Sequence, residues 1–151
     1  GLIDFGCVKH LPLDFMVNYC KIANATIAGD EDEIIILAKK MGVIVGDSKD
    51  AEKAFLEFAA AVKGPFIKDK YTCGVEDDLL MEKVKEAAKN IIKYPEIRSP
   101  RDIIFLHRAL MGIYLMLCRL QHQGEYENIR SNYMKEVLDI FDGLKEDRGW
   151  K

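Results

Sequence analysis

Apolar residues recur with helical spacing over most of the chain, and glycines and prolines separate one amphipathic stretch from the next. Gly29, Gly42, the Gly64-Pro65 pair and Pro95 stand where a helical pattern stops. A helix rarely continues through such residues, so each of them marks a boundary. The pattern therefore predicts a mainly α fold with about six helices, at roughly 12–28, 30–41, 48–63, 76–94, 99–121 and 126–144.

Four consecutive acids at residues 30–33 allow two interpretations, a cation site or the start of a helix. Asp30 has the side chain of an N-cap, and Glu33 stands three residues later, as in a capping box. Acids in the first turn also face the positive end of the helix dipole. We favour the helix start.

The segment 99–121 differs from the other helices because it is apolar almost all round. Ser99 is expected to cap it and Pro100 to occupy its first turn. A helix of this kind is predicted to be the buried centre of its domain. His107 and Arg108 lie inside it, and a buried guanidinium needs a partner. That partner either ties two helices together or lies near an active site. We favour an architectural role for both residues.

The one strand-like stretch is at the start of the chain, where Leu2 and Ile3 lead into Asp4, Phe5 and Gly6. We expect a short N-terminal strand that pairs with something before residue 1, because a lone strand cannot satisfy its own backbone groups. In kinase-like folds, an Asp placed after such a strand holds magnesium on the nucleotide phosphates. The tripeptide alone is weak evidence. Its position at the very start, without an initiating Met, indicates a fragment of a longer protein.

Composition narrows the function classes. The 151 residues are enough for one domain with a real core, and the net charge of −3 argues against a general nucleic-acid surface. No apolar run reaches the length of a membrane span. The histidines show no zinc-ligand spacing with one another or with the cysteines. The four cysteines are far apart, without a Cys-x-x-Cys pair, and are expected to be reduced; they are Cys7, Cys20, Cys73 and Cys118.

Several short motifs together carry a resemblance to a known family: residues 1–6, 28–30, 40–42, 105–108 with 111–112, and 131–133. In their order and rough spacing, over nearly the whole chain, they resemble the C-terminal part of the UbiB/AarF/ADCK family. These atypical protein-kinase-like proteins are tied to ubiquinone (coenzyme Q) biosynthesis. The block of His107 and Arg108, at the right distance from Asp4, makes the resemblance fairly specific.

The resemblance implies that residues 1–151 are the helical C-lobe of a kinase-like domain whose N-lobe and catalytic loop are absent from this chain. It implies that Asp4 binds the magnesium ion of Mg²⁺-ATP, with Gly6 beside it as a cofactor-binding residue. Catalytic residues are expected upstream of Gly1, because the family places its catalytic Asp, its Asn and its phosphate-binding Lys there. The 151 residues alone are therefore predicted to be inactive, and the full-length parent to be an ATP-dependent kinase or ATPase.

The same resemblance implies a nucleotide as ligand, and quinone-biosynthesis proteins or lipid precursors at a membrane surface as further partners. The expected location is cytoplasmic and membrane-associated in a bacterium, or the mitochondrial matrix in a eukaryote. Two alternatives stay open. The chain could come from an aminoglycoside- or choline-phosphotransferase-like kinase, or it could be a non-catalytic helical interaction module in which Asp4 is only a turn residue.

Overall fold

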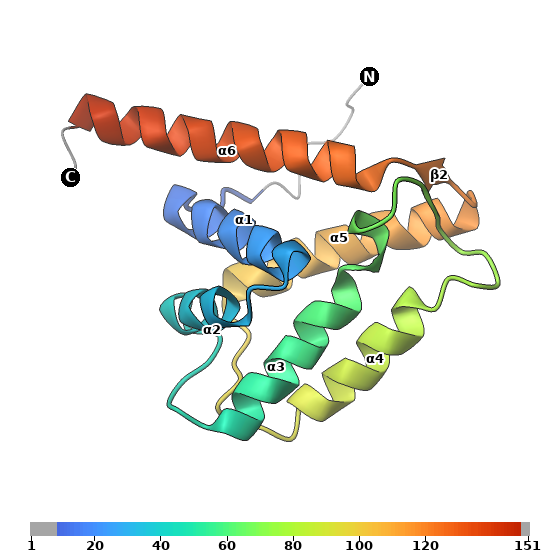
Figure 1. Ribbon diagram of the computed structural model, residues 1–151, viewed down its shortest axis with the longest axis horizontal. Coiled ribbons are helices and arrows are strands. Elements are labelled where there is room, and N and C mark those ends of the chain that lie inside the picture. The colour runs from blue at the N-terminus through green and yellow to red at the C-terminus, as the bar shows by residue number, and fades with distance from the viewer. Residues whose placement is uncertain (1–8, 149–151) are drawn as a thin grey trace.

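The computed structural model describes residues 9–148, with side chains through residue 144, and this part of the chain forms six α-helices (Figure 1). The prediction of a mainly α fold with about six helices is confirmed. The predicted N-terminal strand falls outside the described residues. The helices are α1 (Leu13–Ala28), α2 (Glu31–Lys40), α3 (Lys49–Val62), α4 (Leu80–Ile91), α5 (Arg101–Arg119) and α6 (Tyr126–Arg148).

Local capping sets the ends of the first three helices. Gly29 ends α1 with a left-handed φ of 77°, and its N–H donates to the carbonyl of Ala25. The Asp30 side chain then accepts the N–H of Glu33 at 3.0 Å, so the acidic run starts α2 as expected. Ser48 caps α3 in the same way. By contrast, α5 begins after Pro100 without a side-chain cap, so the expected role of Ser99 as the cap is wrong.

A two-stranded antiparallel sheet was not predicted. Strand β1 (Tyr71–Thr72) follows a short 3-10 turn, η1 (Gly64–Phe66), and pairs with β2 (Gln123–Gly124) just before α6. Two residues per strand are too few to produce an alternating pattern that sequence analysis could detect. The sheet joins the loop before α4 to the connection between α5 and α6 (Figure 1).

The start of α4 is later than predicted, at Leu80 instead of 76. Asp78 explains the difference, because its carboxylate accepts the backbone N–H of Gly74 at 2.7 Å and that of Leu80 at 3.3 Å. These bonds hold residues 74–79 in a loop and satisfy a donor at the new helix end.

The core lies among α1, α2 and α3. One cluster of buried residues contains Ala25, Ile34 and Ala59, and a second contains Ala38, Val43 and Ile44. The second cluster extends to Ile97 just before α5, because Ile44 and Ile97 form an isolated antiparallel bridge.

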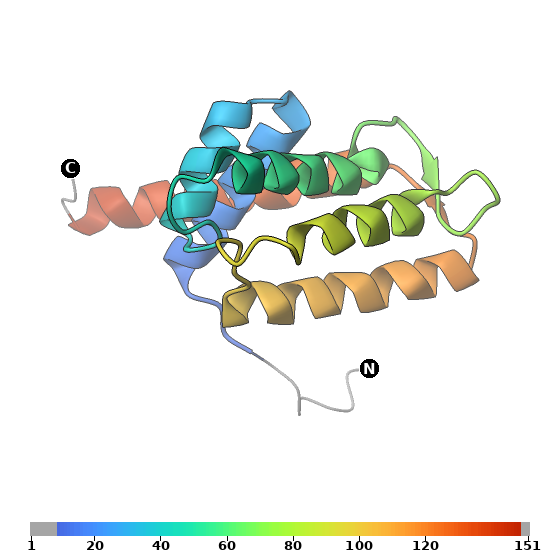
Figure 2. The same cartoon turned by 90° about the horizontal axis from the view of Figure 1, so that it is seen from below.

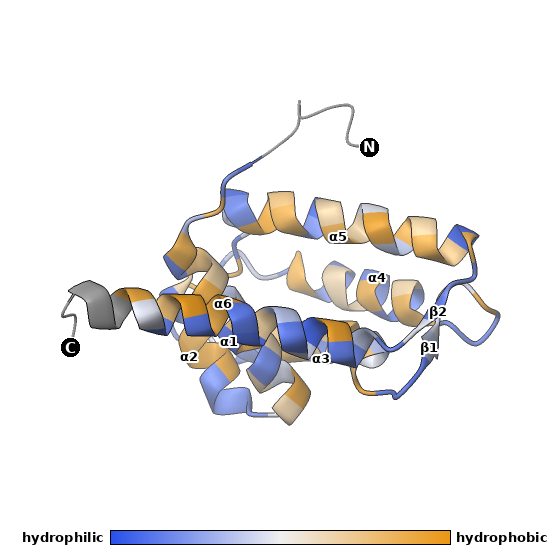
Figure 3. Ribbon diagram, turned by 90° about the horizontal axis from the view of Figure 1, so that it is seen from above, coloured by the Kyte–Doolittle hydropathy of each residue, from blue (hydrophilic) through white to orange (hydrophobic). Residues whose placement is uncertain are grey.

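Helix α5 lies along one edge of the molecule, and the prediction that it is the buried centre is wrong for the described residues (Figures 2 and 3). None of its residues is buried. Burial depends on neighbours, and α5 has none on its outer side among residues 9–148. Much of the α5 ribbon has the hydrophobic colour in Figure 3. Six of its large apolar residues are between 45% and 65% exposed: Ile104, Phe105, Leu110, Ile113, Leu115 and Met116.

Candidate functional site

The sequence-predicted magnesium ligand, Asp4, and its neighbour Gly6 fall outside the described residues. The described chain starts at Lys9, whose ammonium group lies 2.5 Å from a carboxylate oxygen of Asp102. The same ammonium group sits 4.3 Å from the ring centroid of Phe105. Both contacts are partly solvated, so each contributes modestly. Together they hold the chain after the Asp-Phe-Gly motif against the first turns of α5 (Figure 2).

Among residues 9–148, His107 and Arg108 are both exposed, whereas the sequence predicted buried polar residues. The His107 ring still packs edge-on against Tyr19 of α1, with centroids 5.9 Å apart. Loss of water around the ring lowers the pKa of His107. Arg108 has no ion pair or hydrogen bond with any described residue.

The two residues line an open groove of about 510 Å³ on α5. The other residues that line it are Ser99, Ile103, Ile104, Met111, Gly112 and Leu115. Apart from Ser99, His107 and Arg108, the residues that line the groove are apolar side chains and one glycine. It has the character of a packing surface.

A half-buried, paired arginine of the described residues is Arg130 in α6. Its side chain is only 10% exposed, and its guanidinium donates to both carboxylate oxygens of Glu127, at 2.7 and 2.5 Å. It also donates to the side-chain oxygen of Asn24 in α1. The hydrogen bond from Arg130 lowers the pKa of Glu127. The i, i+3 spacing of Glu127 and Arg130 is visible in the sequence. The contact with Asn24, which ties α6 to α1, is not.

Asp78 is the centre of the densest polar cluster. Besides two backbone N–H groups, its carboxylate accepts the hydroxyl of Tyr114 at 2.6 Å and that of Tyr71. Burial raises the pKa of Asp78, but these hydrogen bonds outweigh it, and the net effect is a lowered pKa. Burial and the bond to Asp78 raise the pKa values of Tyr71 and Tyr114. The carboxylate is saturated by protein donors, so it organises the fold and leaves little capacity for a ligand.

A second polar group lies beside this cluster. The Tyr126 hydroxyl is 3.3 Å from the Cys73 sulfur and 2.8 Å from Nδ1 of His122. Burial raises the pKa of the Cys73 thiol, so the reactive thiolate is disfavoured there. Cys20, Cys73 and Cys118 are all free cysteines, while Cys7 falls outside the described residues. This group is therefore a structural contact between the small sheet and α6.

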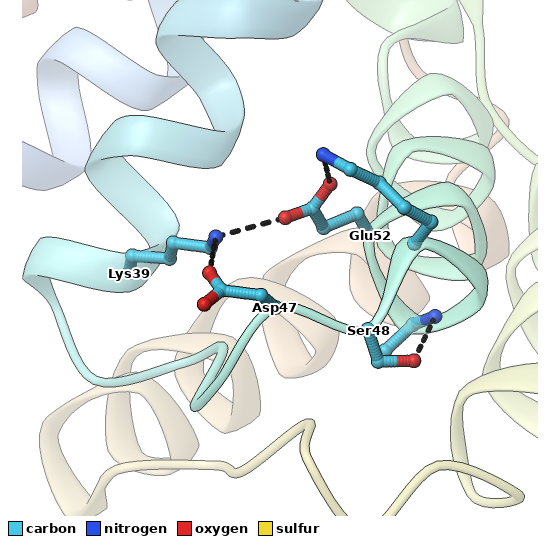
Figure 4. A network of polar contacts seen from close by, with 6 residues as sticks. Lys39, Asp47, Ser48 and Glu52 are labelled. Carbon is cyan, nitrogen blue, oxygen red and sulfur yellow. Dashed lines mark hydrogen bonds and ion pairs between the residues drawn. The ribbon is translucent and has the colours of Figure 1, made fainter.

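A charged cluster joins α2 to α3 (Figure 4). The Lys39 ammonium group lies 2.7 Å from Asp47 and 2.8 Å from Glu52, and Lys49 lies 2.7 Å from the other oxygen of Glu52. The bonds from Lys39 and Lys49 lower the pKa of Glu52. Glu52 is thus ionised and paired, which is what a buried carboxylate requires. In the described part of the chain, no group of three or more His, Cys, Asp or Glu side chains is placed to hold a metal ion.

The polar clusters of residues 9–148 thus stabilise the fold. The class of protein is indicated by similar proteins of known type. The chain is similar to the probable serine/threonine-protein kinase abkA of Dictyostelium discoideum, at 24% identity over 149 residues. It is also similar to the mitochondrial atypical kinase coq-8 of Caenorhabditis elegans, at 23% identity over 146 residues. These relatives confirm the resemblance to UbiB-type atypical kinases, at low identity over most of the chain.

The two matches cover nearly all of this chain but a small part of each relative. They span 91% of the chain and 26% of the first relative, and 92% of the chain and 19% of the second. No family model and no solved structure matches the chain. Among the described residues, no helix is both long and apolar enough to cross a membrane.

Proposed function

We propose that this chain is the helical C-lobe of an atypical kinase or ATPase of the UbiB type that supports ubiquinone biosynthesis. The observation that carries the proposal is its similarity to an atypical kinase over 92% of its length, in a chain that contains an Asp-Phe-Gly motif at residues 4–6. In this proposal Asp4 binds the magnesium ion of Mg²⁺-ATP, with Gly6 beside it. The catalytic Asp, the Asn and the phosphate-binding Lys come from outside residues 1–151, so this chain alone has no turnover.

Two features of the described residues are compatible with that proposal. The carboxylates of Asp78 and Glu52 are already engaged by protein donors, so neither competes with Asp4 as a nucleotide-linked metal ligand. Lys9, five residues after Asp4, is attached to α5 through Asp102.

The proposed ligand and partners follow from the same assignment. The ligand is ATP with Mg²⁺, and quinone-biosynthesis proteins or lipid precursors at a membrane surface are the proposed partners. One relative is mitochondrial, which supports a mitochondrial matrix location if the source is a eukaryote. For a bacterial source we propose a cytoplasmic, membrane-associated protein.

Substitution of Asp4 in the full-length protein tests the assignment. Asp4→Asn keeps the shape of the side chain but removes the charge that holds magnesium. Magnesium-dependent ATP affinity, measured by titration calorimetry, is expected to fall at least about 100-fold, or roughly 2.7 kcal/mol. The melting temperature is expected to stay within about 2 °C, because Asn has almost the same size and shape as Asp.

Asp69→Asn is the matched control, because Asp69 is an exposed acid in the loop between η1 and β1. It is expected to bind Mg²⁺-ATP like the parent. Equal nucleotide affinity in the Asp4 variant and the parent would remove Asp4 from its proposed role. Measurable ATP turnover by the 151-residue chain alone would contradict the prediction that catalytic residues lie elsewhere.

A further inference from the structure

The outer face of α5 combines basic and apolar side chains. Arg101, Arg108 and Arg119 are seven and eleven residues apart, which places them along one line of the helix at 3.6 residues per turn. None of them has an ion pair or hydrogen bond with any described residue. Between them lie apolar side chains that are roughly half exposed, namely Ile104, Phe105, Leu115 and Met116.

Gly112 lies at the middle of this outer face. A Cβ atom added there would meet nothing within 4 Å, and no left-handed φ is found at this position. Glycine weakens a helix relative to alanine, so the fold of residues 9–148 gains nothing from it. What a glycine in a helix does provide is close approach of another backbone. Arg108 is one helical turn before Gly112, beside the space that the missing side chain leaves open.

The groove on α5 has the shape that such an approach requires. It is lined by Ile103, Met111 and Leu115 together with Gly112, and it is open along the helix. The ridge of side chains on a second helix fills a groove of this kind. A flat bilayer surface would gain nothing from the missing side chain at Gly112.

We propose that this face receives an α-helix that carries a carboxylate opposite Arg108 and that belongs to a part of the same kinase-like protein outside residues 1–151. The inference rests on the proposed function. The arginines make α5 positively charged, and its one acid, Asp102, is already paired with Lys9. An acidic occupant would complement that positive charge.

Two further observations indicate where the helix comes from. The matched region is 26% and 19% of the two relatives, so proteins of this kind contain much additional chain. Lys9 also attaches the start of the described chain to the first turns of α5, next to the groove. The first described residue of the chain therefore lies next to this face.

Photo-crosslinking in the full-length protein tests the proposal. A benzoylphenylalanine at position 115 replaces a 49% exposed leucine of the groove, and one at position 36 replaces a 60% exposed isoleucine of α2 as the matched control. The expected result is an intramolecular adduct from position 115, but not from position 36, to a helical peptide with an Asp or Glu outside residues 1–151. An adduct to a second copy, to lipid or only to residues 9–148, or no adduct at all, would overturn the proposal.

Charge and size variants then test the named contacts. Arg108→Glu is expected to lower the adduct yield at least tenfold, whereas Lys53→Glu, at an exposed position of α3, leaves it unchanged. Replacing the acid of the crosslinked peptide by Arg in the Arg108→Glu background is expected to restore the yield. Lack of restoration would show that the two charges do not meet.

The effect of Gly112→Leu on the melting temperature is compared between the 151-residue chain and the full-length protein. In the 151-residue chain the new side chain meets open space, so the melting temperature is expected to stay within a few degrees of the parent. In the full-length protein it is expected to remove the adduct and lower the melting temperature clearly more. Equal effects in both would contradict a docked helix.

The two proposals fail separately. Loss of docking with intact magnesium-dependent ATP binding refutes only the acidic helix. An intact adduct in a protein that does not bind ATP refutes only the kinase assignment.

Discussion

The contact between Gly74 and Cys118 gives the sharpest test of how α5 is attached to the rest of the molecule. Gly74 has a left-handed φ of 71°, and a Cβ atom there would lie 2.5 Å from the carbonyl oxygen of Cys118 and 2.7 Å from its Cα. Both are backbone atoms of α5, so no side-chain rotation can relieve the overlap. Gly74→Ala therefore has to displace either the 74–79 loop or the C-terminal end of α5.

Three contributions make up the expected loss of unfolding free energy in Gly74→Ala. A non-glycine residue in the left-handed region costs about 1 kcal/mol or somewhat more. The overlap with α5 adds about 1–3 kcal/mol, as overpacking generally does. A shift of the loop also weakens the bond from the Gly74 N–H to the Asp78 carboxylate, which is 2.7 Å long, and bonds to charged groups contribute roughly 1.5–3 kcal/mol. The expected loss of unfolding free energy is about 3 kcal/mol or more.

Gly29→Ala is the matched control in the same chain. Gly29 has a similar φ of 77°, but a Cβ atom there meets nothing within 4 Å. Its expected loss is about 1 kcal/mol, the conformational cost alone. Both variants are measured by urea unfolding followed by circular dichroism, with the slope m checked for a change in the transition. Equal losses in the two variants would refute the reasoning, because they would mean that α5 is not held against Gly74.

Two more predictions concern half-buried, hydrogen-bonded charged groups, Arg130 and Asp78. Arg130→Met leaves Glu127 and Asn24 without their partner and is expected to lower the unfolding free energy by about 1–2 kcal/mol, because the pair is only partly screened from water. Arg108→Met, on the exposed face of the 151-residue chain, should change the unfolding free energy by less than about 0.5 kcal/mol. Urea unfolding measures the loss in both variants. A larger loss in Arg108→Met than in Arg130→Met would mean that Arg108 is the arginine that ties two helices together. Because the pKa of Asp78 is lowered in the fold, its contribution is present above the unfolded pKa of about 3.9 and is lost as pH falls through the folded value. Stability below about pH 4 should therefore fall less steeply in Asp78→Asn than in the parent, and parallel acid profiles would contradict this.

The helices could be predicted because their signals are local. Gly29 and Asp30 act within one turn of their own position, and so does Ser48. The predictions failed where a distant group decided the outcome. Helix α4 starts late because the Asp78 carboxylate binds the N–H groups of Gly74 and Leu80, and that carboxylate is itself held by the hydroxyl of Tyr114, 36 positions away. The same holds for β1 and β2, which pair across some fifty residues.

For the candidate site too, the sequence determined what depends on local pattern, and the tertiary structure decided what depends on contacts between distant residues. The sequence alone determined that the chain is mainly helical, that it resembles UbiB-type kinases and that Asp4 is the residue to test, because composition, periodicity and motif order are properties of the chain itself. It also determined that 99–121 is apolar almost all round. Only the tertiary structure decided that, among the described residues, Arg130 and not Arg108 is the arginine that ties two helices together, through its contact with Asn24, 106 residues away. Burial is a relation between elements, and the pattern of one helix cannot specify which neighbours cover it.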